Sequence, residues 1–227
     1  MTRFFLPLLC LLTVSVMAQP YKVPAFTDSD RAAKIQALAP AIETLNRDWA
    51  TKNHFPGLTF GVVVDGQLVL SGGTGFTDVA KKIPATTKSV FRIASMTKSV
   101  TGVAILKLRD AGKLQLDDPI SRYIPEAKNL AYLTTDAAAI TVRDLLTHAG
   151  GFPEDNPWGD RQLADSDADL LALIKNGLSN ANAPGETYEY SNLGFAMLGR
   201  IITVVSGKSY QQYITDEILK PLGMTHT

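Results

Sequence analysis

The signals for β-structure are confined to one short part of this 227-residue chain. Two strand-like runs, 58–64 and 67–71, flank Asp65-Gly66, a dipeptide that favours the positive φ angles of a tight antiparallel turn. A two-stranded hairpin is marginally stable alone and needs further strands beside it. After Ser95 the apolar spacing becomes helical, and no further strand signal follows. We therefore predict an α/β part whose antiparallel sheet is incomplete in this sequence, joined to an all-α region.

Helices are predicted on both sides of the hairpin. Before it, apolar residues from Ile35 to Trp49 recur at three- and four-residue steps, and Pro40 interrupts them. Either one helix kinks at Pro40, or a second helix starts with this proline in its first turn. Beyond the hairpin, capping residues and glycines delimit five further helices: one from Ser95 to Gly112, one from Thr141 to Gly150, and three at 170–174, 192–205 and 210–219. Thr141 and Asp144 resemble an N-capping pair at the start of the second of these helices.

Charge and cysteine content exclude several kinds of protein. Lys and Arg number 22, as do Asp and Glu, so the chain lacks the basic surface that binds nucleic acid. Three histidines without ligand spacing and a single cysteine argue against a structural metal site. Asp165, Asp167 and Asp169 alternate as in a calcium loop, but Leu170 stands where that loop requires glycine. We therefore expect no nucleic-acid partner and no bound metal.

The first eighteen residues have the pattern of a secretory signal peptide. Arg3 precedes an apolar run over 4–12, and we expect cleavage after Ala18, although the sequence leaves open whether cleavage occurs. The apolar core holds Pro7 and is shorter than the roughly 20 residues needed to cross a bilayer, so we expect no stable membrane anchor. The sequence thus predicts a periplasmic or secreted protein. Its only cysteine, Cys10, lies in the leader, so the mature chain is held by its core and not by disulfides.

A candidate nucleophile stands where the helical part begins. In Ser95-Met96-Thr97-Lys98 the serine and the lysine share one helical face, so the amine can lie beneath the hydroxyl. A backbone N–H at this helix end can stabilise an oxyanion on a carbonyl attacked by Ser95. The positive end of the helix dipole disfavours an ammonium ion, which suits Lys98 to act as a base. Alone, the spacing is more typical of a solvated surface lysine, and the extended stretch before it and the later partner residues favour the catalytic interpretation.

A possible partner for this pair is Tyr190-Ser191-Asn192, at the start of a later helix. A phenol and an amine bind protons with similar strength, so Tyr190 and Lys98 can share one proton, take another from Ser95 and return it to a leaving group. Asn192 offers both a donor and an acceptor, and can hold a substrate amide or fix Lys98. The alternative is that Asn192 only caps the helix and Tyr190 only packs nearby.

These residues resemble a known family. Ser95-x-x-Lys98 and Tyr190-x-Asn192, with the stretches Phe91–Leu108, Gly112–Pro119, Leu145–Gly151 and Pro184–Gly194, resemble the serine β-lactamase and penicillin-binding-protein superfamily. The resemblance is strongest to its class C β-lactamase, D,D-carboxypeptidase and esterase branch. It implies a β-lactamase/transpeptidase-like fold, an acyl-enzyme on Ser95, Lys98 and Tyr190 as the activating pair, Asn192 as a substrate contact, and no metal or organic cofactor.

The family's third motif is missing from this sequence. The family carries Lys-Thr-Gly or His-x-Gly on a C-terminal strand that edges the site, and its backbone supplies the second oxyanion donor. His148-Ala149-Gly150 matches the letters but ends a helix well before Tyr190. We therefore expect 19–227 to be part of a longer serine hydrolase domain, with the N-terminal helix and β-hairpin in 19–92 and the nucleophile helix and helical region in 93–227.

The resemblance favours a hydrolase that cleaves amide or ester bonds through an acyl-Ser95 intermediate. Its substrate is a small molecule or a peptide, and β-lactams, D-amino-acid peptides and small esters all suit these residues. The alternatives are a non-catalytic relative that binds penicillin or cell-wall peptide, and an inactive fragment without the third motif. The sequence leaves the oligomeric state open.

Turnover by this chain alone is expected to be slow or absent. Loss of one oxyanion donor costs a serine acyl enzyme about 10² to 10³ in rate, and a wall of the pocket is lost with it. The purified 19–227 chain should therefore hydrolyse nitrocefin and p-nitrophenyl acetate barely above background. Fast turnover that Ser95→Ala abolishes would contradict this prediction.

Overall fold

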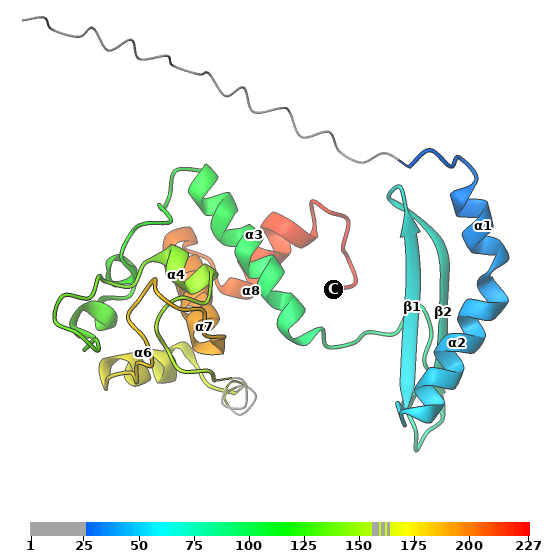
Figure 1. Cartoon of the computed structure of the whole chain (residues 1–227), viewed down its shortest axis with the longest axis horizontal. Coiled ribbons are helices and arrows are strands. Elements are labelled where there is room, and N and C mark those ends of the chain that lie inside the picture. The colour runs from blue at the N-terminus through cyan, green and yellow to red at the C-terminus, as the bar shows by residue number, and fades with distance from the viewer. Residues whose placement is uncertain (1–25, 156–158, 160–161, 163) are drawn as a thin grey trace, which may run out of the picture. The chain divides into compact units, whose positions relative to one another are not determined.

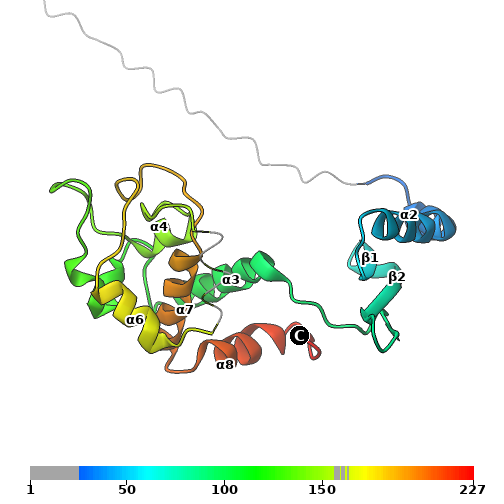
Figure 2. The ribbon, with the colours of Figure 1, turned by 90° about the horizontal axis from the view of Figure 1, so that it is seen from below.

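The computed structural model describes residues 26–155, 159, 162 and 164–227, so the signal peptide expected at 1–18 lies outside the described residues. The chain divides into two compact units, residues 1–89 and 90–227. Figures 1 and 2 show both units. No helix among the described residues is long and apolar enough to cross a membrane.

The first unit is a small antiparallel sheet with two helices. Strands β1 (Gly57–Val64), β2 (Gln67–Asp78) and β3 (Ile83–Pro84) lie in the order β1-β2-β3. The hairpin predicted at Asp65-Gly66 is confirmed: the two residues have φ angles of 51° and 74°, and Val64 pairs with Gln67. Two features differ from the sequence prediction: β2 runs on to Asp78, and β3 adds a short third strand.

Helices α1 (Arg31–Ala37) and α2 (Ala39–Lys52) lie along this sheet (Figure 1). Pro40 occupies the first turn of α2, so the second alternative for this proline is correct. Among residues 26–89 only Ala50 and Ala85 are buried apolar residues, while Leu45 on α2 and Val63 and Leu68 on the sheet are each more than 60% exposed. The helix and the sheet therefore leave much apolar surface uncovered within the described residues, as expected where the sheet is incomplete.

The second unit is helical, with short 3₁₀ turns in its connections. Thr141 and Asp144 form the predicted capping box of α4, and Ser166 and Asp169 form another at α6. Asp169 is thus a helix-capping residue. The elements are η1 (Ala94–Met96), α3 (Thr97–Asp110), η2 (Ile120–Arg122), η3 (Pro125–Asn129), α4 (Val142–Leu146), α6 (Asp167–Lys175), α7 (Asn192–Ser206), α8 (Tyr210–Ile214) and η4 (Thr215–Leu219), of which η4 is a π-helical turn.

Helix α7 is the centre of this unit. It packs against α3, α4, α6 and α8 (Figures 1 and 2). Met197, Leu198 and Ile201 on α7 are completely buried, as is Ile105 on α3, and all four belong to one hydrophobic cluster. Apolar residues recur along α7 at three- and four-residue steps, so burial of this face explains why the segment is helical.

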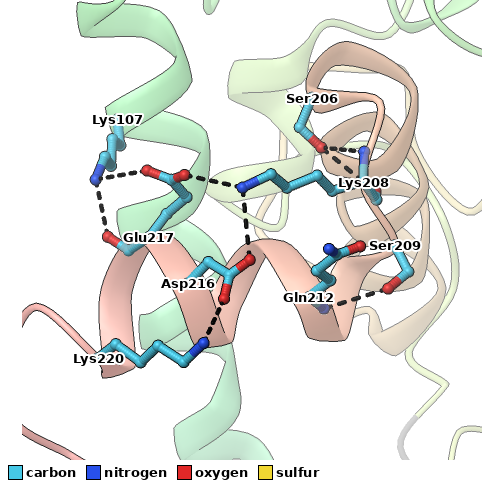
Figure 3. Close-up of polar contacts among 8 residues, drawn as sticks. All are labelled: Lys107, Ser206, Lys208, Ser209, Gln212, Asp216, Glu217 and Lys220. Atoms are coloured by element: carbon cyan, nitrogen blue, oxygen red, sulfur yellow. Dashed lines mark hydrogen bonds and ion pairs between the residues drawn. The ribbon is translucent and has the colours of Figure 1, made fainter.

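An ionic network joins α3 to the last helical turns (Figure 3). Lys107 on α3 lies 3.2 Å from one carboxylate oxygen of Glu217 and donates to its backbone oxygen at 2.8 Å. Lys208 lies 3.1 Å from the other carboxylate oxygen and 3.5 Å from Asp216, which also pairs with Lys220 at 2.8 Å. The hydrogen bond from Lys208 is the main reason that the pKa of Glu217 lies below its ordinary value. The hydrogen bond from Lys220 lowers the pKa of Asp216 in the same way.

Replacing a central side chain of α7 should cost much of the stability of this unit. Ile201→Ala should lower the free energy of unfolding by about 2–5 kcal/mol, because Ile201 is 0% exposed and leaves a cavity. Val204→Ala on the same helix, where the side chain is 43% exposed, should change it by less than about 0.5 kcal/mol. Urea unfolding followed by circular dichroism measures both. Equal losses in the two variants would contradict this account of the core.

The network of Figure 3 should stabilise the unit in a salt-dependent way. Glu217→Gln should lower Tm slightly at low ionic strength, and the difference should shrink in 1 M NaCl because the charges are partly exposed. The Tm difference should also vanish in acid. Because folding lowers the pKa of the Glu217 carboxyl, its contribution to stability is present above the ordinary pKa and is lost as the pH falls through the lowered value. The control is Glu186→Gln, which removes the same charge from an exposed loop. A Tm difference that is insensitive to salt and pH would refute the electrostatic origin.

Candidate active site

The serine and the lysine are placed by the start of α3. Ser95 lies in η1, the single 3₁₀ turn before α3, whereas the sequence predicts that it begins the helix itself. Ala94, which precedes it, has a φ angle of 45°, in the left-handed region that residues other than glycine seldom adopt. Lys98 is the second residue of α3, and its Nζ donates to Ser95 Oγ at 3.3 Å. The three-residue spacing therefore brings the amine to the hydroxyl, as expected.

Asn192, the first residue of α7, and Tyr190, two residues before it, lie at the same place. Tyr190 Oη lies 2.6 Å from Ser95 Oγ, and Lys98 Nζ donates to Asn192 Oδ1 at 2.5 Å. Tyr190 Oη also donates to Asn192 Oδ1 at 3.5 Å. The structure thus gathers all four predicted residues into one hydrogen-bonded group within the unit 90–227. Their catalytic roles remain predictions.

The structure excludes the alternative that Asn192 only caps the helix. Ser191, and not Asn192, caps α7: its Oγ accepts the backbone N–H of Gly194 at 3.0 Å. The side chain of Asn192 is therefore free of the capping role and receives the hydrogen bond from Lys98. Of the two uses expected for this amide, fixing Lys98 is the one seen in the geometry.

Aromatic rings border the amine of Lys98. Its Nζ lies 4.8 Å from the centroid of the Tyr190 ring and 5.5 Å from that of Phe195, distances at which a ring face attracts a cation. Lys98 is half-buried, whereas Ser95 is exposed. A carbonyl compound can therefore reach the hydroxyl while the activating groups stay partly shielded from water.

Asp155 is a site residue that the sequence pattern does not predict. One carboxylate oxygen accepts the backbone N–H of Asn192 at 2.6 Å, and the other accepts Ser191 Oγ and the backbone N–H of Leu193, each at 2.9 Å. A carboxylate is favourable at a helix N-terminus, where backbone N–H groups lack helical partners. Asp155 thus anchors the segment that carries Tyr190 and Asn192. No local pattern reveals this role, because 36 to 38 residues separate the partners.

The sequence places His148 at a helix end, and the structure adds contacts with the site. It follows the end of α4, with a φ angle of 57°. Its Nδ1 accepts the backbone N–H of Ser191 at 3.0 Å, and its ring stacks on that of Tyr190 with centroids 4.7 Å apart. Burial and, secondarily, the charge of Lys98 lower the pKa of His148, while Asp155 opposes the shift. His148 is therefore a neutral neighbour of the site near pH 7.

No group of three or more His, Cys, Asp or Glu side chains suited to a metal ion occurs among the described residues. The described residues bring a serine hydroxyl into contact with an amine and a phenol. The hydroxyl can pass its proton to the amine or the phenol as it attacks a carbonyl, and these groups can later release the proton to a leaving group.

Comparison with known proteins places the chain in a family. A family described as Beta-lactamase matches residues 34–227. Protein flp of Staphylococcus aureus strain MW2 is 39% identical over 188 residues, which cover 82% of this chain and 37% of that protein.

Solved structures agree with this match. An octameric penicillin-binding protein homologue from Pyrococcus abyssi is 31% identical with a TM-score of 0.70, over 82% of this chain and 43% of that one. A class C β-lactamase is 26% identical with a TM-score of 0.71, over 86% and 51%. The chain spans about half of the length of these proteins, or less. The family match over residues 34–227 and the shared fold show that the chain belongs to the β-lactamase family, within the superfamily of serine β-lactamases and penicillin-binding proteins.

Proposed function

We propose that Ser95 attacks the carbonyl of an amide or ester and forms a covalent acyl-enzyme, which water then hydrolyses. The observation that carries this proposal is the position of Ser95 Oγ, 2.6 Å from Tyr190 Oη and 3.3 Å from Lys98 Nζ. Both distances lie within or near the range for direct proton transfer along a hydrogen bond.

The proposed reaction runs through the Tyr190–Lys98 pair. As Ser95 Oγ forms its bond to the carbonyl carbon, its proton passes to this pair, and the backbone N–H of Ser95 stabilises the oxyanion. Collapse of the intermediate breaks the bond to the leaving group, which takes the proton back from the pair. In the second half, water gives up a proton to the same pair as its oxygen bonds to the acyl carbon. The bond from that carbon to Ser95 Oγ then breaks, and the pair returns the proton to Ser95 Oγ.

Asn192 holds the pair in place and has one further function in this proposal. Its Oδ1 is occupied by Lys98, so its amide N–H₂ is the group that would donate to a substrate carbonyl.

Residues 90–227 leave the choice among β-lactams, D-amino-acid peptides and small esters open. We place a general serine hydrolase first and a true β-lactamase second. Export by residues 1–18 would put the site in the periplasm or outside the cell, where peptide and β-lactam substrates occur.

Covalent labelling tests this function without requiring fast turnover. The protein should form an adduct on Ser95 with a fluorescent penicillin or with a fluorophosphonate, detected by intact mass and peptide mapping. Ser95→Ala should abolish the adduct. Lys98→Ala and Tyr190→Phe should slow its formation by about 10²- to 10⁴-fold, because each removes a proton-transfer group. Ser99→Ala, on the same helix, is the matched control and should label like the parent.

Two results would contradict the proposal. An adduct that persists in Ser95→Ala would place the nucleophile elsewhere. Reversible binding of the penicillin without a Lys98-dependent adduct would instead favour the non-catalytic binding protein.

A further inference from the structure

His148 contacts the segment that carries Tyr190 at three points. Its backbone oxygen accepts the N–H of Glu189 at 2.8 Å, and its Nδ1 accepts the N–H of Ser191 at 3.0 Å. Between these two bonds its ring stacks on the ring of Tyr190, with an interplanar angle of 28°. One residue thus holds both chain neighbours of Tyr190 and the phenol ring itself.

The bond from Ser191 to His148 requires a neutral imidazole of one tautomer. Because Nδ1 is the acceptor, the single ring proton resides on Nε2. Protonation would place an N–H opposite the N–H of Ser191 and break the bond. Ser191 is only 4% exposed, so water cannot readily replace the lost acceptor.

The groups around the ring favour this neutral state. Lys98 on α3 brings a positive charge, and Asp155 brings a negative charge from the chain after α4. Tyr188, Tyr190 and Phe195 surround the ring, with centroids 5.5, 4.7 and 5.0 Å away. Burial and Lys98 together outweigh Asp155, so the pKa of His148 lies below its ordinary value of 6.5.

We propose that neutral His148 is a positioning residue that fixes the hydroxyl of Tyr190 against Ser95 by holding the chain on both sides of the tyrosine. The proposal rests on the proposed function of Tyr190 in proton transfer. His148 acts only through Tyr190, since its described contacts include neither a hydrogen bond to Ser95 nor one to Lys98. A displacement of about 1 Å at a reacting group can cost of order 10²-fold in rate, so loss of this clamp should be visible in acylation.

Two substitutions separate the hydrogen bond from general packing. Asn and Gly both tolerate the left-handed backbone at residue 148, but only Asn offers an acceptor near the position of Nδ1. His148→Gly should slow labelling of Ser95 by about 10²-fold. His148→Asn should restore most of the rate. Equal rates in the two variants would overturn the role of the acceptor.

A double-mutant cycle tests whether His148 acts through Tyr190. In a Tyr190→Phe background, His148→Gly should cause little further loss, because the hydroxyl that it positions is already gone. The same 10²-fold loss in both backgrounds would show an independent, structural effect and would overturn the proposal.

Nuclear magnetic resonance decides the question even where no adduct forms or the double variant is too slow to measure. With ¹⁵N-labelled histidine, the signal that His148→Asn removes should show the Nε2–H tautomer and titrate below pH 6.5. The amide signal of Ser191 and the ring signals of Tyr190 should move with the same titration. An Nδ1–H tautomer, or Tyr190 signals that ignore this titration, would overturn the clamp while leaving the function of Ser95 to the labelling experiment.

Discussion

The packing of α3 against α7 determines where the reactive groups of this protein lie. Ser95 and Tyr190 are 95 residues apart, and neither helix places both of them. Burial of Ile105 on α3 and of Met197, Leu198 and Ile201 on α7 fixes the two helices in one core. Their N-terminal ends then hold the serine, the lysine and the asparagine together. Because protein interiors are tightly packed, a small shift between the helices would be transmitted to the hydrogen bonds of the site.

The sequence predicted the features that depend on local chemistry. Asp65-Gly66 indicated the hairpin, Pro40 an interruption that is either a kink or the start of a second helix, and Thr141 with Asp144 an N-capping pair, because each acts through its immediate neighbours in the chain. The sequence does not predict the end of β2, because the glycines in this part of the strand weaken the alternating apolar pattern. The structure explains one of them: a Cβ on Gly73 would lie 2.6 Å from the backbone oxygen of Ala85, so the close approach of the chain demands glycine.

The candidate site shows the same division between local and distant signals. The spacing of Ser95 and Lys98 on one helical face was visible in the sequence, and the resemblance to a family joined them to Tyr190 and Asn192. The partners that hold these residues were not visible. Asp155 and His148 contact the start of α7 across 36 and 43 residues of sequence. No local sequence pattern around a single aspartate or histidine predicts such a contact. Their roles follow from the folded chain alone.

The backbone at Ala94 restricts which amino acids can precede the nucleophile. At a φ angle of 45°, a side chain branched at Cβ would collide with its own carbonyl group, whereas alanine bears the strain with a single methyl. Valine or isoleucine there would push the chain toward an ordinary conformation and rotate the following peptide, on which the direction of the serine side chain depends. Among variants of this protein, diversity at residue 94 should therefore be narrow for a reason that concerns the main chain rather than any contact with a ligand.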